Sequence, residues 1–597
     1  MAVIAHVDAG KSTLVDAFLA QSHVFSDHDE VVEQVMDSND LERERGITIY
    51  SKNCSVNYKD YKINIVDTPG HADFSSEVER IIKTVDTVIL LVDSSEGPMP
   101  QTRFVLKKSL EANLRPILLI NKIDKKDQRA IQVIDEVYDL FLDLKATDDQ
   151  LDFPILYGIA KEGIVRYEMD DTNNDIEPLF ETIVKHVQPY PNVMDKPLRM
   201  QVSALAYDDY IGRIGIGRVY DGVIKANEMV TVCDCDIKKE NRKIANLYNY
   251  QGLKRTAITE AQCGDIVLIS GIDNIEIGDT ICQLGDVDPM PQIDIEEPTM
   301  SMNFMVNSSP FQGKSGKFVT SRNIRERLER ELEVNVGLKV EETDSTDTFK
   351  VSGRGELHLS ILIETMRRQG YEFQVSRPQV ITKEIDGVRN EPVEILMIEV
   401  PDEYVGAVME KLGTRKAELV NMDTNGSGTT HIEFRIPSRG LMGYRPEFLT
   451  DTNGNGIMNH VFDAYEPWKG EIITRHQGSL IAWETGDTVA YGLNAAQERG
   501  RLFVGPGVPV YEGMIVGASP KAEDLTVNVC KKKHMTNTRA SGSDDALKLT
   551  PPSIMSLEQC LEFIGDDELV EVTPKNIRMR KMILSREQRM KNQNRKK

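Results

Sequence analysis

The chain has 597 residues, of which 40% are hydrophobic and 28% are charged, and its formal net charge at pH 7 is −24. At roughly 150 residues per domain this length predicts about four folded domains, and the acidic total argues against a general nucleic-acid-binding protein. No apolar run is long enough for a transmembrane helix, the start lacks the features of a secretion signal, and seven scattered cysteines indicate reduced thiols rather than a disulfide framework.

The first chemical motif is a phosphate-binding loop at positions 5–13, Ala-His-Val-Asp-Ala-Gly-Lys-Ser-Thr. It follows a short apolar run, precedes a helix-like segment, and departs from the GxxxxGK[ST] pattern only at Ala5. Backbone N–H groups around Gly10 can enclose phosphates at the helix N-terminus, while Lys11 supplies a positive charge and the Ser12 hydroxyl can bind Mg²⁺. The predicted nucleotide contacts of this loop are Asp8, Ala9, Gly10, Lys11, Ser12 and Thr13.

Two further strings before position 72 fit a magnesium and γ-phosphate site. Arg-Gly-Ile-Thr occupies positions 45–48, and Thr48 there can bind Mg²⁺ and sense the γ-phosphate in a loop that a bound nucleoside triphosphate orders. Residues 62–67 are predicted to form a strand that ends in Asp-Thr-Pro-Gly-His at 67–71. The Asp67 carboxylate can hold Mg²⁺ through water, and the Gly70 N–H can reach the γ-phosphate. The predicted metal ligands are Ser12, Thr48 and Asp67.

A third strand-like run, residues 115–120, leads into Asn121-Lys122-Ile123-Asp124. The Asp124 carboxylate can accept two hydrogen bonds from the N1–H and the exocyclic amine of guanine. Adenine has an acceptor at N1 and would leave this charge facing a lone pair, a mismatch large enough to exclude ATP. Three such strings in this order, each after an apolar strand, predict a guanine-nucleotide site that binds GTP or GDP with Mg²⁺.

These strings resemble those of the elongation-factor class of GTPases, especially the ones at 45–48 and 67–71. By that resemblance His71 is the catalytic residue that orients the attacking water, because it stands where Ras-like proteins have a glutamine; the alternative is an ordinary surface histidine. The last guanine-contacting loop of the family carries a Ser-Ala pair, which corresponds here to Ile159-Ala160 followed by Lys161. Ala160 can still offer its backbone N–H, whereas Ile159 lacks the hydroxyl. Relatives usually have several more residues before the phosphate loop, which is compatible with a natural start further upstream.

The rest of the chain resembles the later modules of translation factors. Residues 198–291 have short β-patterned runs and glycine turns like the β-barrel that follows the GTPase domain. Residues 298–378 and 391–468 resemble the third and fifth domains of elongation factor G. Only 14 positions separate Pro378 from Pro392, too few for that factor's long fourth domain, so translocation by such a lever is excluded.

The last 125 or so residues resemble the C-terminal domain peculiar to the BipA/TypA family, through strings such as Arg-Gly-Arg-Leu-Phe-Val-Gly-Pro-Gly at 499–507. The predicted fold is therefore multidomain α/β and β. Its parts are a P-loop GTPase domain (1–193), a translation-factor β-barrel (194–293), two ferredoxin-like α+β domains (294–384 and 385–472) and a family-specific β-rich C-terminal domain (473–597).

The resemblance implies a cytoplasmic, ribosome-associated monomer that hydrolyses GTP to GDP and phosphate, is stimulated by the ribosome, and has no membrane partner. It implies a role in large-subunit assembly or in translation under stress or cold, with rRNA, ribosomal proteins and tRNA as candidate partners. Lys532, Lys533 and Arg539 are candidate RNA contacts, because basic side chains on a loop can reach phosphates; ordinary solvated charge is their alternative. Two other functions stay open, a LepA-like ribosomal GTPase and a signalling GTPase that acts on protein partners only.

Overall fold

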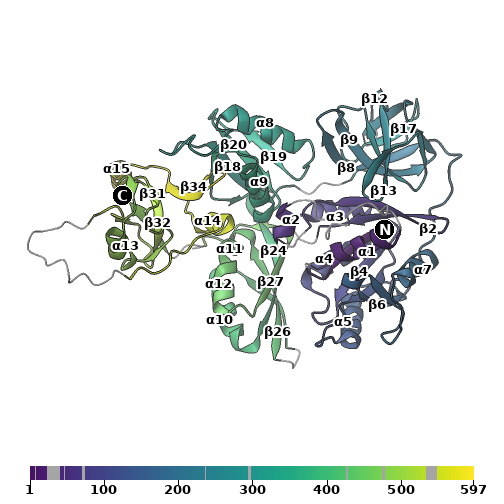
Figure 1. Ribbon diagram of the computed structural model, residues 1–597, viewed down its shortest axis with the longest axis horizontal. Coiled ribbons are helices and arrows are strands. Elements are labelled where there is room, and N and C mark those ends of the chain that lie inside the picture. The colour runs from purple at the N-terminus through teal and green to yellow at the C-terminus, as the bar shows by residue number, and fades with distance from the viewer. Residues whose placement is uncertain are drawn as a thin grey trace, which may run out of the picture. The chain divides into compact units, whose positions relative to one another are not determined.

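The computed structural model describes residues 1–6, 8–22, 40–45, 48–69, 74–234, 237–293, 297–424, 428–472, 477–532 and 548–596. The chain forms two compact units, residues 1–296 with 333–337 and residues 297–332 with 338–597. Both units combine helices and strands (Figure 1). Every helix within the described ranges is too short or too polar to span a lipid bilayer.

The first unit begins with a largely parallel sheet. Over the described residues its strand order is β2-β3-β1-β4-β5-β6-β7, in which only the edge strands β2 and β7 are antiparallel to their neighbours. All residues of β4 and β5 are buried, as expected for central strands covered on both faces. The strands are β1 (Ala2–Ala5), β2 (Lys52–Tyr58), β3 (Tyr61–Asp67), β4 (Val88–Asp93), β5 (Ile117–Asn121), β6 (Ile155–Ile159) and β7 (Ile164–Arg166).

Helices cover both faces of this sheet and divide its core into two apolar clusters. The side chains of α3, α4 and α5 contribute to one cluster, and those of α1 and α7 contribute to the other. Because the parallel strands end at the same edge, the loops that follow β1, β3, β5 and β6 meet there. The helices are α1 (Lys11–Gln21), α2 (Asp40–Arg45), α3 (Ser75–Ile82), α4 (Pro100–Glu111), α5 (Ala130–Asp143), α6 (Asp148–Leu151) and α7 (Glu177–His186), with a 3-10 turn η2 at Ala160–Glu162.

An antiparallel β module follows in the same unit. Its strands run in the order β12-β11-β17-β8-β9-β16-β13-β14, with β10 paired to β15, and they share one apolar core. This agrees with the predicted translation-factor barrel. The strands are β8 (Arg199–Asp208), β9 (Gly212–Asp221), β10 (Val223–Lys225), β11 (Met229–Asp234), β12 (Ile237–Lys243), β13 (Asn246–Gln251), β14 (Lys254–Ala257), β15 (Glu260–Gln262), β16 (Ile266–Ser270) and β17 (Thr280–Gln283).

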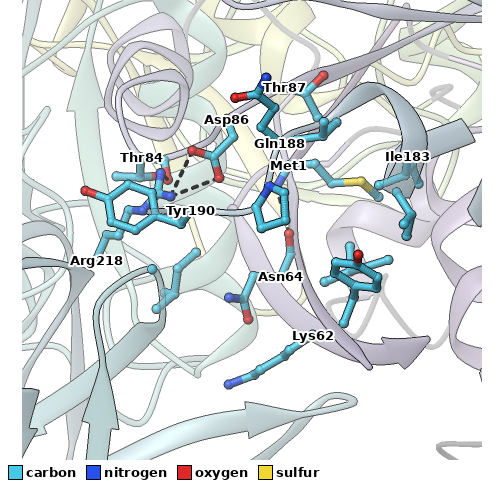
Figure 2. Close-up of a pocket in the computed structure, with 17 residues that line it drawn as sticks. Met1, Lys62, Asn64, Thr84, Asp86, Thr87, Ile183, Gln188, Tyr190 and Arg218 are labelled. Atoms are coloured by element: carbon cyan, nitrogen blue, oxygen red, sulfur yellow. Dashed lines mark hydrogen bonds and ion pairs between the residues drawn. The ribbon is translucent and has the colours of Figure 1, made fainter. Parts of the chain in front are cut away.

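Arg218 of β9 joins the barrel to the parallel-sheet module. Its Nη2 donates to both carboxylate oxygens of Asp86 at 2.8 and 2.9 Å, and its Nη1 donates to the Thr84 carbonyl at 3.0 Å. The guanidinium also lies 4.2 Å from the ring centroid of Tyr190. Figure 2 shows these side chains at the edge of a small cavity of about 140 Å³. Arg218 is buried, so this bidentate pair fixes the barrel against the turn that follows α3.

The second unit contains two modules with βαββαβ order. In each, the first strand lies between the third and the fourth, with strand orders β19-β20-β18-β21 and β25-β26-β24-β27, which is the predicted ferredoxin-like arrangement. Helices α10 and α12 lie on one face of the second sheet (Figure 1). The first module has β18 (Met300–Val306), α8 (Ser321–Leu332), β19 (Lys339–Glu342), β20 (Thr348–Gly353), α9 (Glu356–Arg368) and β21 (Phe373–Ser376). The second has β24 (Val388–Pro401), α10 (Val405–Thr414), β25 (Glu418–Thr424), β26 (Thr429–Pro437), α12 (Tyr444–Asp451) and β27 (Ile457–Pro467).

Shorter elements accompany these two modules, and the C-terminal part of the unit is rich in strands, as predicted. The shorter elements are β22 (Gln379–Val380), β23 (Lys383–Ile385), η3 (Asp402–Tyr404) and α11 (Ser438–Leu441). The C-terminal elements are β28 (Gly478–Ala482), β29 (Gly486–Asp487), α13 (Ala490–Gln497), β30 (Arg501–Leu502), β31 (Pro509–Val510), β32 (Met514–Ser519), β33 (Leu525–Val527), α14 (Leu557–Phe563), β34 (Glu568–Val572), β35 (Ile577–Lys581) and α15 (Arg586–Lys596).

The C-terminal strands extend the sheet of the first ferredoxin-like module. Strand β34 pairs antiparallel with β21, from Phe373↔Val572 to Ser376↔Leu569, so one sheet runs β19-β20-β18-β21-β34-β35-β32-β28-β33. The core is shared as well, because Leu561 and Val570 belong to the same apolar cluster as Phe373. The modules predicted at 294–384 and 473–597 thus share a sheet and a core, while their boundaries stay a prediction.

A buried carboxylate connects the loop after β18 with the C-terminal strands. Glu571 of β34 has no exposed surface and accepts hydrogen bonds from Asn307 Nδ2 at 3.2 Å, Ser309 Oγ at 2.9 Å and the Tyr511 hydroxyl at 2.8 Å. Arg578 Nη1 lies 3.3 Å from its Oε1. Burial, and then the neighbouring Glu571 carboxylate, raise the pKa of Tyr511, so the phenol remains a donor to Glu571.

Candidate guanine-nucleotide site

Three of the loops that the sequence predicted to bind nucleotide meet around one cavity of about 640 Å³, a size that suits a small-molecule ligand. They come from the carboxyl ends of β1, β5 and β6, at the edge where ligands bind in open α/β sheets. Ala9 is buried beside the cavity, and the exposed Asp124 is open to a base entering from solvent. The predicted residues that line the cavity are Asp8, Gly10, Thr13, Asn121, Lys122, Asp124, Ala160 and Lys161.

The phosphate loop needs glycine at position 10. Gly10 caps α1 with φ 97° and ψ 28°, in the left-handed region that side chains rarely adopt. A Cβ atom there would lie 2.6 Å from Asn121 Nδ2, so a larger residue would push the phosphate loop away from the loop after β5. The position of the first glycine in the motif does not have this requirement. It is occupied by Ala5, which is the last residue of β1 and is buried in the sheet.

Asn121 holds three loops together. Its Nδ2 donates to the Ala9 carbonyl at 2.7 Å, and its Oδ1 accepts from the Ala160 N–H at 2.9 Å. The Ala160 N–H, predicted to face the base, is therefore engaged by Asn121 in this structure. Lys122 Nζ donates to the Asp8 carbonyl at 2.5 Å, and Ile123 donates its backbone N–H to the Gly158 carbonyl at 3.4 Å. These contacts hold the phosphate loop and the loops after β5 and β6 together at the cavity.

Lys11, Thr48 and Asp67 converge at the other end of the phosphate loop. Lys11 Nζ donates to Thr48 Oγ1 at 2.7 Å, to Asp67 Oδ1 at 2.6 Å and to the Thr68 carbonyl at 2.6 Å. All three side chains are buried, and Ser12 follows Lys11 in the first turn of α1. Among the described residues, the buried Asp67 Oδ2 has no hydrogen-bond partner. Two hydroxyls and a carboxylate with a free oxygen fit Mg²⁺, which prefers oxygen ligands and keeps bound waters.

Two carboxylates near the site were not predicted from the sequence. Asp93, at the end of β4, contacts Lys122 Nζ at 2.9 Å and Lys125 Nζ at 3.1 Å. Burial opposes the ionisation of Asp93, but hydrogen bonds from Lys122, Ser95 and Lys125 outweigh it and lower its pKa. Its position after the apolar run Val-Ile-Leu-Leu-Val could have identified it, as it did Asp67. The second residue, Glu42 in α2, lies in a charged segment that carries no such signal.

Several predicted residues lie outside the described part of the chain. These are Gly70 and His71 of the string at 67–71, and Lys533 and Arg539 among the candidate RNA contacts. Lys532 is described and exposed, as a phosphate contact requires. The roles of these five residues stay predictions.

Family models match four segments of the chain. Residues 1–189 match the elongation factor Tu GTP binding domain, and residues 212–282 match elongation factor Tu domain 2. Residues 388–476 match the elongation factor G C-terminus, and residues 477–586 match the TypA/BipA C-terminal domain. The predicted multidomain translation-factor architecture is thereby confirmed, and the chain carries a GTP-binding domain of the translation-factor kind.

Curated relatives match the chain from end to end. The chain is 52% identical to the large ribosomal subunit assembly factor BipA of Bacillus subtilis (strain 168), over 99% of this chain and 97% of that protein. It is 50% identical to the protein of the same name from Synechocystis sp., over 98% of each. A crystal structure of a protein from Thermus thermophilus covers 78% of the chain with a TM-score of 0.54 at 15% identity, and the match spans 97% of that protein, which supports the fold alone.

The C-terminal match decides between the two ribosomal GTPases that the sequence left open. Residues 477–586 fit the TypA/BipA domain, and the curated relatives named above are BipA proteins over nearly their whole length. A LepA-like assignment is not supported. The chain belongs to the TypA/BipA family of translational GTPases.

Proposed function

We propose that this chain is a cytoplasmic, monomeric GTPase that binds the ribosome and assists assembly of the large subunit, including under stress or low temperature. The observation that carries the GTPase part of the proposal is the convergence of Lys11, Thr48 and Asp67 beside a cavity lined by Asp124. Relatives half identical to the chain bear the name large ribosomal subunit assembly factor. The proposal includes the predicted division of the chain into five modules. It also includes rRNA, ribosomal proteins and tRNA as the contacts of the chain on the ribosome.

The residues of the site divide the work of binding and hydrolysis. Asp124 selects guanine, and Asn121 keeps the phosphate loop beside the base loop. Ser12, Thr48 and Asp67 would hold Mg²⁺, which would neutralise charge on the phosphates. Lys11 exchanges its carboxylate and carbonyl partners for phosphate oxygens. His71 orients the attacking water, and the Gly70 N–H reaches the γ-phosphate.

Ribosome-dependent turnover tests the proposal. We expect purified ribosomes to stimulate GTP hydrolysis by the wild-type chain, and we expect His71→Ala to reduce the stimulated rate by about 10² to 10⁴-fold. GTP affinity should stay unchanged, because His71 acts on water rather than on the nucleotide. His186→Ala, a histidine at the end of α7 in the same unit, is the control. A wild-type rate that ribosomes leave unchanged would instead favour a signalling GTPase.

The candidate RNA contacts make a separate prediction. Reversing Lys532, Lys533 and Arg539 to glutamate should abolish co-sedimentation with ribosomes without changing GTP affinity. Neutralising them to alanine should reduce the slope of log affinity against log salt by about 2 to 3, since each lost phosphate contact removes about one released counterion. Lys521→Glu, an exposed lysine of the same part of the chain, is the control. Unchanged sedimentation of the triple reversal would exclude these residues as contacts.

A further inference from the structure

Glu42 is a carboxylate in α2 with no exposed surface. Its Oε1 accepts hydrogen bonds from the backbone N–H of Ile49 at 3.0 Å and of Tyr50 at 3.2 Å. Its Oε2 accepts from Lys52 Nζ at 2.6 Å. A buried carboxylate is tolerated only when such donors replace its lost water. The three donors therefore fix Glu42 against the chain segment that leads into β2.

The segment that Glu42 holds begins next to Thr48. Ile49 is the residue after Thr48, and Thr48 Oγ1 accepts the hydrogen bond from Lys11 Nζ at 2.7 Å. Thr48 is only 5% exposed. The backbone N–H of Ile49 belongs to the peptide unit that joins Thr48 to Ile49. A hydrogen bond to this N–H therefore limits how far the backbone of Thr48 can move away from Lys11 and Asp67.

A second carboxylate supports the same segment from another helix. Glu77 Oε2 of α3 accepts from the Ser51 N–H at 3.4 Å, a longer contact than those of Glu42. The N–H groups of residues 49, 50 and 51 are therefore all directed at acidic side chains, two of them at Glu42. Hydrogen bonds from backbone N–H groups to an ionised carboxylate are stronger than those between neutral groups, and Glu42 makes the shorter bonds here.

We propose that Glu42 is a positioning residue that holds Thr48 where its hydroxyl can bind Mg²⁺ beside the γ-phosphate, and that it thereby sets the preference of the site for GTP over GDP. This inference rests on the proposed magnesium–GTP site. A threonine in this loop contributes when a γ-phosphate is present and is released after hydrolysis. Loss of its positioning therefore weakens GTP binding and leaves GDP binding nearly unchanged.

Glu42→Gln is the informative variant. It keeps the volume of the side chain and one carbonyl acceptor, but it removes the charge and turns an amide donor toward the ammonium group of Lys52. We expect the dissociation constant for GTP to rise about 10-fold or more in the presence of Mg²⁺, with that for GDP changing less than about twofold. Glu44→Gln, an exposed glutamate of the same helix, should change neither constant.

Variants of Thr48 test whether Glu42 acts through this residue. Thr48→Ala should reproduce the selective loss of GTP affinity. If Glu42 acts by holding Thr48, the double variant Glu42→Gln with Thr48→Ala should be no weaker than Thr48→Ala alone, because two residues that serve one contact are not additive. Glu42→Gln in the wild-type background should also reduce the gain in GTP affinity on adding Mg²⁺.

The experiment is a titration of the full chain with fluorescent GTP and GDP analogues over a series of Mg²⁺ concentrations, together with the thermal midpoint of each variant. A selective, Mg²⁺-dependent and non-additive loss supports the inference. Equal losses for GTP and GDP, or an additive double variant, overturn it and assign Glu42 a purely structural role. If Thr48→Ala leaves GTP affinity intact, the proposed magnesium site is wrong, and the inference about Glu42, which rests on that site, is wrong as well.

Discussion

Replacing Asp124 with asparagine is expected to weaken GTP binding by about 10² to 10⁴-fold and to admit xanthosine triphosphate in its place. In the proposed site the carboxylate accepts from the N1–H and the amine of guanine, and two charge-assisted hydrogen bonds contribute about 3 to 6 kcal/mol together. An asparagine amide can donate to the carbonyl that xanthine carries in place of the amine. Asp124 is exposed and lines the cavity, so its side chain is accessible to the base of either nucleotide.

Titration calorimetry with GTP, xanthosine triphosphate and ATP, in the presence of Mg²⁺, measures this change of specificity. Asp127→Asn is a matched control, since it is an exposed aspartate three positions further along the chain, and it should leave all three affinities unaltered. Equal affinities of the wild-type chain for GTP and either of the other nucleotides would contradict the assignment of Asp124.

Glu571→Ala is expected to lower the free energy of unfolding of the second unit by about 3 to 5 kcal/mol, the usual effect of removing one partner from a buried charged network. The change removes the acceptor of Asn307, Ser309 and Tyr511 and leaves Arg578 without this carboxylate. Glu571→Gln, which keeps one acceptor, should cost about 1 to 3 kcal/mol.

Urea unfolding followed by tryptophan fluorescence reports on this unit, because both tryptophans of the chain, Trp468 and Trp483, belong to it. Glu523→Ala removes an exposed glutamate of the same unit and should change stability by less than about 0.5 kcal/mol. A Glu571→Ala transition that coincides with that of the wild type would show that the network contributes little to folding.

The nucleotide site was predictable because its parts are local strings at strand ends. A carboxylate after an apolar strand, as at Asp67 and Asp124, or a glycine before a helix, as at Gly10, depends on few neighbours. The two ferredoxin-like modules were predictable for a related reason, since each is built from consecutive elements. The contacts that arrange the loops were not, because Asn121 reaches Ala9 and Ala160, which lie far from it in the sequence.

The pairing of β21 with β34 had no signal in the sequence. Residues 377–567 separate the two strands. Alternating apolar residues indicate that a segment forms a strand, but they do not show which other strand it pairs with. Glu42 was missed for a similar reason: in the string Leu-Glu-Arg-Glu-Arg at 41–45, nothing distinguishes the buried glutamate from the exposed Glu44. Burial is decided by the fold around the helix rather than by the helix itself.

The sheet shared by β21 and β34 has a consequence for the synthesis of this protein. As the nascent chain grows, the outer edge of β21 offers unpaired N–H and C=O groups until residues 568–572 have left the ribosome. During that interval the apolar residues that Leu561 and Val570 will cover are incompletely packed. The second unit must therefore complete its fold late, and prematurely terminated chains will present an open edge strand that invites aggregation.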